Sequence, residues 1–278
     1  MGRPRVFEFV LLLLAAAFAL YGFGPPRAVF GYRPDARSDS ALRIVTWNIG
    51  QADGTRTRRA GSDEGAFQQI RETLRELDAD VSILQEVSAD VLRSMADGLP
   101  GSSTAFSGAP NAGCGIITQR GHLVHLDGLE GASGDPVHVL FRPREGRALQ
   151  VIGLHADAWS ASRRNQEIGS AVDLMEETAE FPLHVLAGDL NLDVDLGGGK
   201  DLFTEDEYLD VQTYNYVVER MHDAASDGGP TAEPDRRLDY IFIWSRTGDL
   251  GIQDAGVWRG RRADGMDHHP VVVDIARN

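Results

Sequence analysis

Three segments in the second half of the chain place acids and a histidine at the ends of apolar runs. Asp189 and Asn191 follow one run, Asp239 lies at the start of another, and Asp267 comes 28 residues after Asp239, directly before His268. Carboxylates, an amide and an imidazole that meet at strand ends can bind a divalent cation, position a water and transfer protons. Hydrolysis of a phosphoester needs these tasks, so the spacing predicts metal-assisted phosphoester chemistry.

Three more polar residues end apolar runs earlier in the chain. Glu86 is a hard oxygen donor of the kind that Mg²⁺ prefers, so we expect it at a metal with Asn48 beside it. A strand-end acid by itself is more often an ordinary exposed side chain, and a lone histidine such as His155 is more often a hydrogen-bonded core residue. The six motifs therefore count as a set: Thr46-Trp47-Asn48-Ile49-Gly50, Leu84-Gln85-Glu86, Gly153-Leu154-His155, Gly188-Asp189-Leu190-Asn191, Arg237-Leu238-Asp239-Tyr240-Ile241-Phe242 and Asp267-His268-His269-Pro270.

In this order the motifs resemble those of the endonuclease/exonuclease/phosphatase superfamily, over residues 41–276. That superfamily includes pancreatic-type deoxyribonucleases, abasic-site endonucleases, neutral sphingomyelinases and inositol-polyphosphate phosphatases. The resemblance implies an α+β fold, a four-layer α/β/β/α sandwich of two packed mixed sheets as in deoxyribonuclease. It also implies a divalent cation, Mg²⁺ or in its place Mn²⁺ or Ca²⁺.

The motif residues have expected roles. Asp189 positions or activates the attacking water, and Asp239 fixes the tautomer of His268 for general acid or base work. His155 protonates the leaving group or binds the phosphate. The expected catalytic set is His155, Asp189, Asn191, Asp239 and His268; the expected metal residues are Glu86, Asp267 and Asn48; and Asn48 and Asn191 are expected to bind substrate.

Arginine supplies nearly all of the basic side chains, with Lys200 the only lysine. A guanidinium can hold a phosphate through two parallel hydrogen bonds, and on this ground we expect Arg164 to bind substrate. An arginine-rich composition also scatters arginines over loops, so both interpretations stay open. Asp189 and Asn191 likewise have a structural alternative, an Asx turn that merely ends a strand. Cys114, between two glycines, is expected to be a small buried residue.

Two features depart from the family pattern. Met266 stands where a serine usually precedes the Asp-His pair, which is expected to loosen a hydrogen bond without removing the pair. The chain also lacks an obvious long aromatic hairpin of the sort that lets secreted sphingomyelinases enter a membrane surface. The second departure weakens the lipid branch of the family, although Trp159 follows His155 closely and could contact substrate.

The chain of 278 residues is long enough for one large domain, and 42% of its residues are hydrophobic. A basic leader precedes an uncharged run of 15 residues, 9–23. This run predicts a signal peptide or a membrane anchor over residues 1–24, followed by a linker over 25–40 and the catalytic domain over 41–278. We therefore expect a monomer that is periplasmic or secreted, or that is anchored to the membrane by this helix.

The formal charge of −15 disfavours tight binding of long polyanions such as duplex DNA. His-Glu-x-x-His and Cys-x-x-Cys zinc motifs, a P-loop and a dinucleotide Gly-x-Gly-x-x-Gly run are all absent from the sequence. These observations favour a phosphodiesterase that acts by in-line attack of water on nucleic acid, phospholipid or a small phosphoester. The alternatives are a phosphomonoesterase of the same fold and a catalytically inactive binding or scaffold protein.

Apolar patterning predicts eight strands and three covering helices. The strands are expected at 43–48, 81–85, 115–119, 137–141, 148–155, 183–188, 238–244 and 271–275. The helices are expected at 64–77, 89–99 and 163–177, with a further helix around 216–221 after a Thr204-x-x-Glu207 capping box.

Overall fold

The computed structural model describes residues 32–50, 63–109, 112–129, 134–194, 207–260 and 266–277. The predicted leader and Thr204 lie outside these ranges. Within them, no helix combines the length and the apolar character needed to cross a bilayer.

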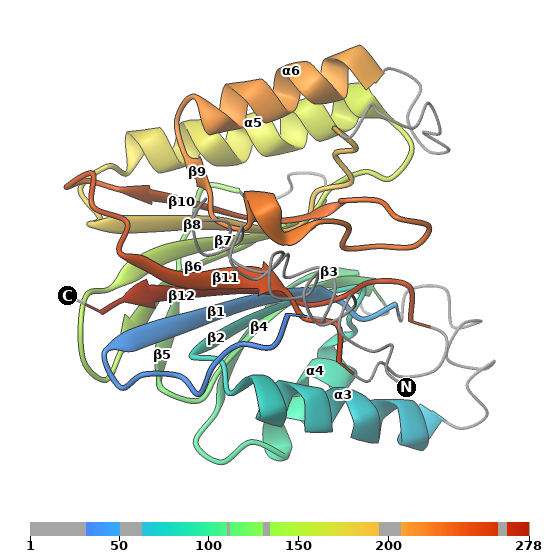
Figure 1. The fold of residues 1–278 in the computed structure, drawn as a ribbon, viewed down its shortest axis with the longest axis vertical. Helices are drawn as coiled ribbons and strands as arrows, with labels where there is room; N and C mark the ends of the chain where they lie inside the picture. The colour runs from blue at the N-terminus through green and yellow to red at the C-terminus, as the bar shows by residue number, and fades with distance from the viewer. Residues whose placement is uncertain are drawn as a thin grey trace, which may run out of the picture.

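Two six-stranded mixed sheets form the centre of the molecule (Figure 1). The first has the order β11-β12-β1-β2-β4-β3 and the second the order β5-β6-β7-β8-β10-β9. In the first sheet the bounds are β1 Ala41–Asn48, β2 Val81–Gln85, β3 Ser103–Ala109, β4 Ala112–Thr118, β11 Ile252–Val257 and β12 Val271–Ala276. In the second they are β5 Gly121–His125, β6 Val137–Pro143, β7 Leu149–His155, β8 Leu183–Asp189, β9 His222–Asp223 and β10 Asp239–Ser245.

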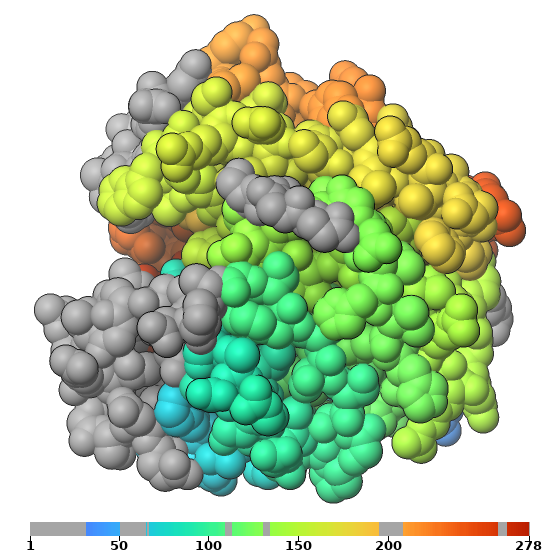
Figure 2. All heavy atoms as spheres, turned by 180° about the vertical axis from the view of Figure 1, so that it is seen from behind, coloured from blue at the N-terminus to red at the C-terminus, as the bar shows by residue number. Residues whose placement is uncertain are grey.

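Four α-helices of the described chain cover the outer faces of the sheets. Helices α3 (Asp63–Leu77) and α4 (Ala89–Asp97) cover the first sheet, and α5 (Ala161–Glu177) and α6 (Glu207–Val218) cover the second. A short 3-10 helix, η3 (Ser226–Gly228), follows β9. From behind, α5 and α6 form the upper part of the surface, above the segment that runs from α4 to β6 (Figure 2). The result is the predicted α/β/β/α sandwich.

Strand β8 shows how the sequence builds these layers. Leu183, Val185 and Ala187 pack between the two sheets, whereas Leu186 on the other face packs against α5. Successive side chains of a strand point to opposite faces, so a strand buried on both faces is apolar throughout. This continuous apolar pattern is why the central strands could be recognised from sequence.

All eight predicted strands are present, with ends that shift by up to three residues, and the helices at 64–77, 89–99 and 163–177 are confirmed. Strands β3, β5, β9 and β11 were not predicted, since they are short, half-exposed or rich in small and polar residues. The helix predicted around 216–221 has the wrong bounds, because α6 begins at Glu207 and ends at Val218. Its position is fixed by contacts with α5, such as Asn165 Nδ2 to Thr213 Oγ1 at 2.8 Å, which no local pattern reveals.

Each sheet contains one parallel pair of strands, β1 with β2 and β7 with β8. Parallel neighbours end at the same edge of a sheet, and both pairs end at the same end of the sandwich, toward the right in Figure 1. Strand β10 begins there, and the segment before β12 returns there. The fold thus carries the six sequence motifs to one end of the molecule.

Candidate active site

Three neighbouring strands align the central residues of the site. His155 on β7 and Asp239 on β10 are both register partners of Asp189 on β8. Close approach of β7 and β8 depends on Gly188, because a Cβ at this position would lie 1.8 Å from the Leu154 carbonyl oxygen. The glycine of the Gly-Asp-Leu-Asn motif therefore serves the strand pairing that positions Asp189.

Asp239 and His268 form the predicted pair. His268 Nδ1 lies 2.8 Å from Asp239 Oδ2, and both residues are buried. Burial by itself would lower the pKa of His268, but the carboxylates of Asp239 and Asp189 outweigh it and raise this pKa to about 10. Because Asp239 holds Nδ1, the other ring nitrogen, Nε2, is the one directed toward Asp189.

The two carboxylate oxygens of Asp189 have different environments. Oδ1 accepts a hydrogen bond from the backbone N–H of Asn191 at 3.0 Å, which is an Asx turn. Oδ2 lies 3.7 Å from His155 Nε2 and 3.7 Å from His268 Nε2, too far for a direct hydrogen bond to either ring. One oxygen thus shapes the turn, while the other faces two imidazoles across a gap.

Asn48 connects the two sheets at this point. Its Nδ2 donates to Asp189 Oδ2 at 2.8 Å and to Glu86 Oε1 at 3.1 Å, while its Oδ1 accepts from the backbone N–H of Gly50 at 2.9 Å. The amide nitrogen therefore faces the two carboxylates and holds them together. The expected contact of Asn48 with a metal stays a prediction.

Glu86 and Asn191 occupy equivalent places, each directly or almost directly after a central strand. Both have positive φ angles, +53° for Glu86 and +50° for Asn191. Residues other than glycine adopt this conformation at a cost, and such residues are concentrated at functional sites. Leu190 between Asp189 and Asn191 is buried in the apolar cluster with α5, and Asn191 Nδ2 donates to the Ala156 carbonyl at 2.9 Å.

A group of possible metal ligands lies at the centre of this end. Single ligand atoms of Asp189, Asp239 and His268 lie within 4.8 Å of one another. Buried Asp239 Oδ1 has no hydrogen-bond partner in the described chain, and burial raises the pKa of this carboxyl group. Glu86 joins the group through Asn48, and Asp267 lies next to His268. This excess of oxygen donors fits a divalent cation.

Sequence reasoning missed Thr231, which is buried. Its Oγ1 accepts hydrogen bonds from the backbone N–H groups of Leu238 and Asp239, at 2.9 and 3.0 Å. Its carbonyl accepts from His269 N at 2.7 Å, so Thr231 connects the segment of Asp239 to that of His268. The only signal in the sequence is a hydroxyl residue eight positions before Asp239, which is too weak to be noticed alone.

Arg164 lies away from this group. The side chain is 0% exposed and forms two hydrogen bonds with Asp210, Nε to Oδ1 at 2.9 Å and Nη2 to Oδ2 at 2.6 Å. Its Nη1 donates to the Asp157 carbonyl at 2.9 Å. With these donors used inside the protein, we do not retain Arg164 as a phosphate-binding residue. Its role is to join α5 to α6.

The sequence prediction for Cys114 is confirmed. The thiol is buried, and burial raises its pKa to about 12, which suits a packing residue and not a nucleophile. Met266 is half-buried beside the apolar cluster under α3 and α4. The expected loosening of a hydrogen bond at this position stays a prediction.

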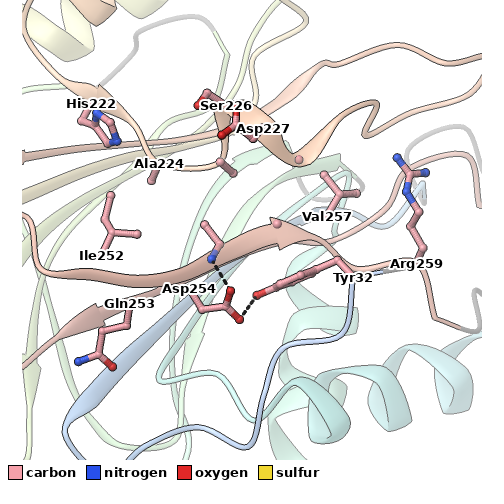
Figure 3. Close-up of a pocket in the computed structure, with 14 residues that line it drawn as sticks. Tyr32, His222, Ala224, Ser226, Asp227, Ile252, Gln253, Asp254, Val257 and Arg259 are labelled. Atoms are coloured by element: carbon pink, nitrogen blue, oxygen red, sulfur yellow. Dashed lines mark hydrogen bonds between the residues drawn. The ribbon is translucent and has the colours of Figure 1, made fainter. Parts of the chain in front are cut away.

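A groove of about 400 Å³ lies apart from this site, between η3 and β11 (Figure 3). Tyr32 and Asp254 meet on one side of it, and the Tyr32 hydroxyl donates to Asp254 Oδ2 at 2.9 Å. None of the motif residues lines the groove. It therefore does not belong to the group around Asp189.

Comparison with known proteins agrees with this geometry. The Endonuclease/Exonuclease/phosphatase family matches residues 45–258, 214 of the 278 residues. Among solved structures, a protein of that family from Bacteroides thetaiotaomicron is 18% identical, with a TM-score of 0.64 over 89% of this chain and 100% of that one. No curated protein matches in sequence.

Two further solved structures have the same fold. A 3′ phosphatase from Neisseria, bound to a product DNA hairpin, is 14% identical with a TM-score of 0.59, over 84% of this chain and 99% of its own. An AP endonuclease from Archaeoglobus fulgidus is 14% identical, with a TM-score of 0.60. The match covers 84% of this chain and 98% of that one. At these identities the likeness concerns the fold.

Proposed function

Since the chain belongs to the endonuclease/exonuclease/phosphatase family, we propose that it is a divalent-metal-dependent phosphodiesterase that hydrolyses its substrate by in-line attack of water. One observation carries the proposal. Asp189 Oδ2 faces the Nε2 atoms of His155 and His268 at 3.7 Å each, so a base and two proton-transfer groups surround one position. A water and a phosphoryl group need this set of partners.

Each side chain of the site has its own proposed role in the reaction. Asp189 aims the attacking water and accepts its proton, and Asn48 holds the Asp189 carboxylate in place. Asp239 fixes the ring of His268, whose Nε2 contacts a phosphoryl oxygen. His155 is more exposed, so it suits protonation of the leaving oxygen, which must depart toward solvent.

The donor set fits a hard cation held by Glu86 and Asp267, with Asp189 and Asp239 beside it. When bound, Mg²⁺ or a similar ion neutralises charge on the phosphoryl oxygens. The observation that favours such an ion is the buried Oδ1 of Asp239, which has no hydrogen-bond partner among the described residues.

The proposed substrate is a phosphodiester in nucleic acid, a phospholipid or a small molecule. The formal charge of −15 favours substrates with few phosphates. A phosphomonoester is the second candidate, because one protein of similar fold is a 3′ phosphatase. The apolar run at residues 9–23 supports a proposed place outside the cytoplasm or at the membrane.

The test measures turnover of bis-p-nitrophenyl phosphate, plasmid DNA and sphingomyelin with Mg²⁺, Mn²⁺, Ca²⁺ or EDTA. We expect hydrolysis that requires a metal and that falls about 10²- to 10⁴-fold in Asp189→Asn, the range for loss of a general base. Both oxygens of buried Asp189 accept hydrogen bonds and an amide nitrogen cannot, so the variant should unfold at a lower temperature. Turnover is therefore compared at a temperature at which thermal unfolding shows both proteins to be folded.

Full activity in Asp189→Asn would refute the assigned mechanism. If none of the three diesters is hydrolysed but p-nitrophenyl phosphate is, the result would favour the phosphomonoesterase. Absence of metal uptake in calorimetry would favour a binding protein.

A further inference from the structure

The loop between β7 and α5 carries a tryptophan that the proposed chemistry does not use. Trp159 is 69% exposed. The other large apolar side chains that are exposed in the described chain are Val124, Tyr208 and Val218. An exposed indole next to a catalytic group is a feature of recognition sites, because its ring offers a large, rigid contact surface.

This loop is part of the wall of the active site. It starts directly after His155, and the Ala156 backbone contacts both halves of the motif turn: Ala156 N donates to the Asp189 carbonyl at 2.9 Å, and the Ala156 carbonyl accepts from Asn191 Nδ2 at 2.9 Å. Three residues of extended chain reach at most about 11 Å, so the Trp159 backbone lies within that distance of Ala156. The Trp159 backbone therefore lies at the same end of the sandwich as the turn that carries Asp189 and Asn191.

The loop is also held rigidly. Asp157 Oδ1 accepts hydrogen bonds from the backbone N–H groups of Trp159 and Ser160, at 2.8 and 2.7 Å. Asp157 N donates to Glu167 Oε2 at 2.8 Å, and the Asp157 carbonyl accepts from buried Arg164. A contact group on a fixed backbone loses little conformational entropy when a ligand binds. These bonds hold the Trp159 backbone in one position before a ligand binds.

We propose that Trp159 stacks on a planar ring of the substrate, so that the site takes a phosphoester with a nucleobase or a similar flat heterocycle near its phosphate. This inference rests on the proposed function, because it places the phosphate at Asp189. Stacking on an indole tolerates any flat ring, and it adds affinity without adding positive charge. The acidic protein can thereby bind a nucleotide that its net charge would otherwise disfavour.

The environment of Trp159 favours one ring over a lipid surface. Its neighbours Ala158 and Ser160 are small and half-buried, and Arg163 nearby pairs with Asp157 at 3.3 Å. Entry into a bilayer surface needs several apolar side chains on one face. A single indole between small and polar neighbours suits contact with a single ring.

The test compares AMP with ribose 5-phosphate, in which a hydroxyl group replaces adenine. Both are titrated by calorimetry with Mg²⁺ into the full chain carrying Asp189→Asn, so that turnover does not disturb binding. The ratio of the two Kd values isolates the contribution of adenine. We expect AMP to bind about 5- to 150-fold more tightly, the range for one stacked base.

Three variants in the same background complete the experiment. Trp159→Ala should bring the ratio close to one, and Trp159→Phe should restore most of it, because phenylalanine keeps a ring. Tyr208→Ala is the matched control, since Tyr208 is 71% exposed but lies on α6, and it should leave the ratio unchanged. A ratio near one in the parent, or an unchanged ratio in Trp159→Ala, would overturn the proposal.

A lipid partner gives a different result. If Trp159→Ala abolishes sedimentation with phosphatidylcholine vesicles and leaves the AMP preference intact, the indole serves a membrane surface and the nucleotide proposal fails. The proposed function is judged separately from turnover. Loss of hydrolysis in Asp189→Asn supports it whether or not AMP is preferred.

Discussion

The buried carboxylates at the two ends of the central strands have different partners. At the start of β1, Arg43 pairs with Asp274 through two hydrogen bonds of 2.7 Å, and Asp80 accepts from Arg277 at 2.8 Å. At the other end, buried Asp189 and Asp239 contact histidine, amide and backbone groups, and neither contacts an arginine in the described chain. The first end pairs its carboxylates with arginines, whereas the second pairs them with a histidine and with neutral donors.

Two histidines show the same difference. Near the far end of β8, His184 is buried between Phe181 and Trp244 without an acid in hydrogen-bond contact, and burial lowers its pKa. At the catalytic end, His268 is also buried, yet its two carboxylate neighbours raise its pKa to about 10. Burial alone therefore does not decide the charge of an imidazole, because its neighbours decide it.

The largest expected effect on stability is at the end where the carboxylates pair with arginines. Asp274→Asn should lower the free energy of unfolding by about 3 to 5 kcal/mol, because it leaves the buried Arg43 guanidinium without its charged partner. The folded fraction should keep its turnover. Urea unfolding of this variant is compared with Asp90→Asn, which removes an exposed pair with Arg93 and should cost under about 1 kcal/mol. Equal losses in the two variants would show that the Arg43 pair has no special role.

Variants of Thr231 test how much its hydrogen bonds stabilise the catalytic end. Thr231→Val keeps the shape but removes the acceptor of two buried N–H groups, so the free energy of unfolding should fall by about 1 to 3 kcal/mol. The kcat should fall with it, because Asp239 and His268 lose their common support, whereas Thr231→Ser should keep both properties. Denaturation and steady-state kinetics of the pair give the answer. A valine variant with wild-type kcat and stability would contradict this role.

Metal should stabilise the fold because neither Asp189 nor Asp239 pairs with an arginine in the described chain. At 100 times its Kd, Mg²⁺ should raise the free energy of unfolding by about 2.7 kcal/mol. Glu86→Gln should reduce this gain, and Asp274→Asn should keep it despite lower initial stability. Thermal melts with a series of Mg²⁺ concentrations measure the gain. If Mg²⁺ no longer stabilises Asp274→Asn, the two ends are not independent.

The smallest expected effect concerns acid pH and His184. Because burial lowers the pKa of His184, the unfolded chain binds a proton more readily, and stability must fall as pH drops below the unfolded pKa of about 6.5. His184→Phe should flatten this part of the pH dependence. Urea unfolding at intervals from pH 7 to pH 5 provides the comparison. An unchanged slope in the variant would assign the acid sensitivity to other groups.

Sequence reasoning reached the fold and the motif residues because both depend on local signals. A strand buried on both faces is apolar throughout, and a polar residue at its end stands out, as Glu86 and Asp189 do. The edge strands β3 and β11 lack this contrast, since one side of each is solvated. Their presence depends on pairing with distant segments.

The same limit explains the two errors at the site. Arg164 was expected to bind phosphate because arginine commonly does so, but its partner Asp210 is 46 residues away. Thr231 was missed because its function is to accept two backbone N–H groups and connect two segments. The role of such a side chain depends on which distant segments meet in the folded protein, and residue spacing in the sequence does not reveal that.

The hydrogen bond from Asn48 to Asp189 joins one sheet to the other, and so does the pair of Asp239 and His268. Neither sheet alone contains a complete site. The proposed activity should therefore return during refolding only after the two sheets have docked. Turnover would thus report assembly of the whole sandwich, which spectroscopic signals of helices or hairpins do not.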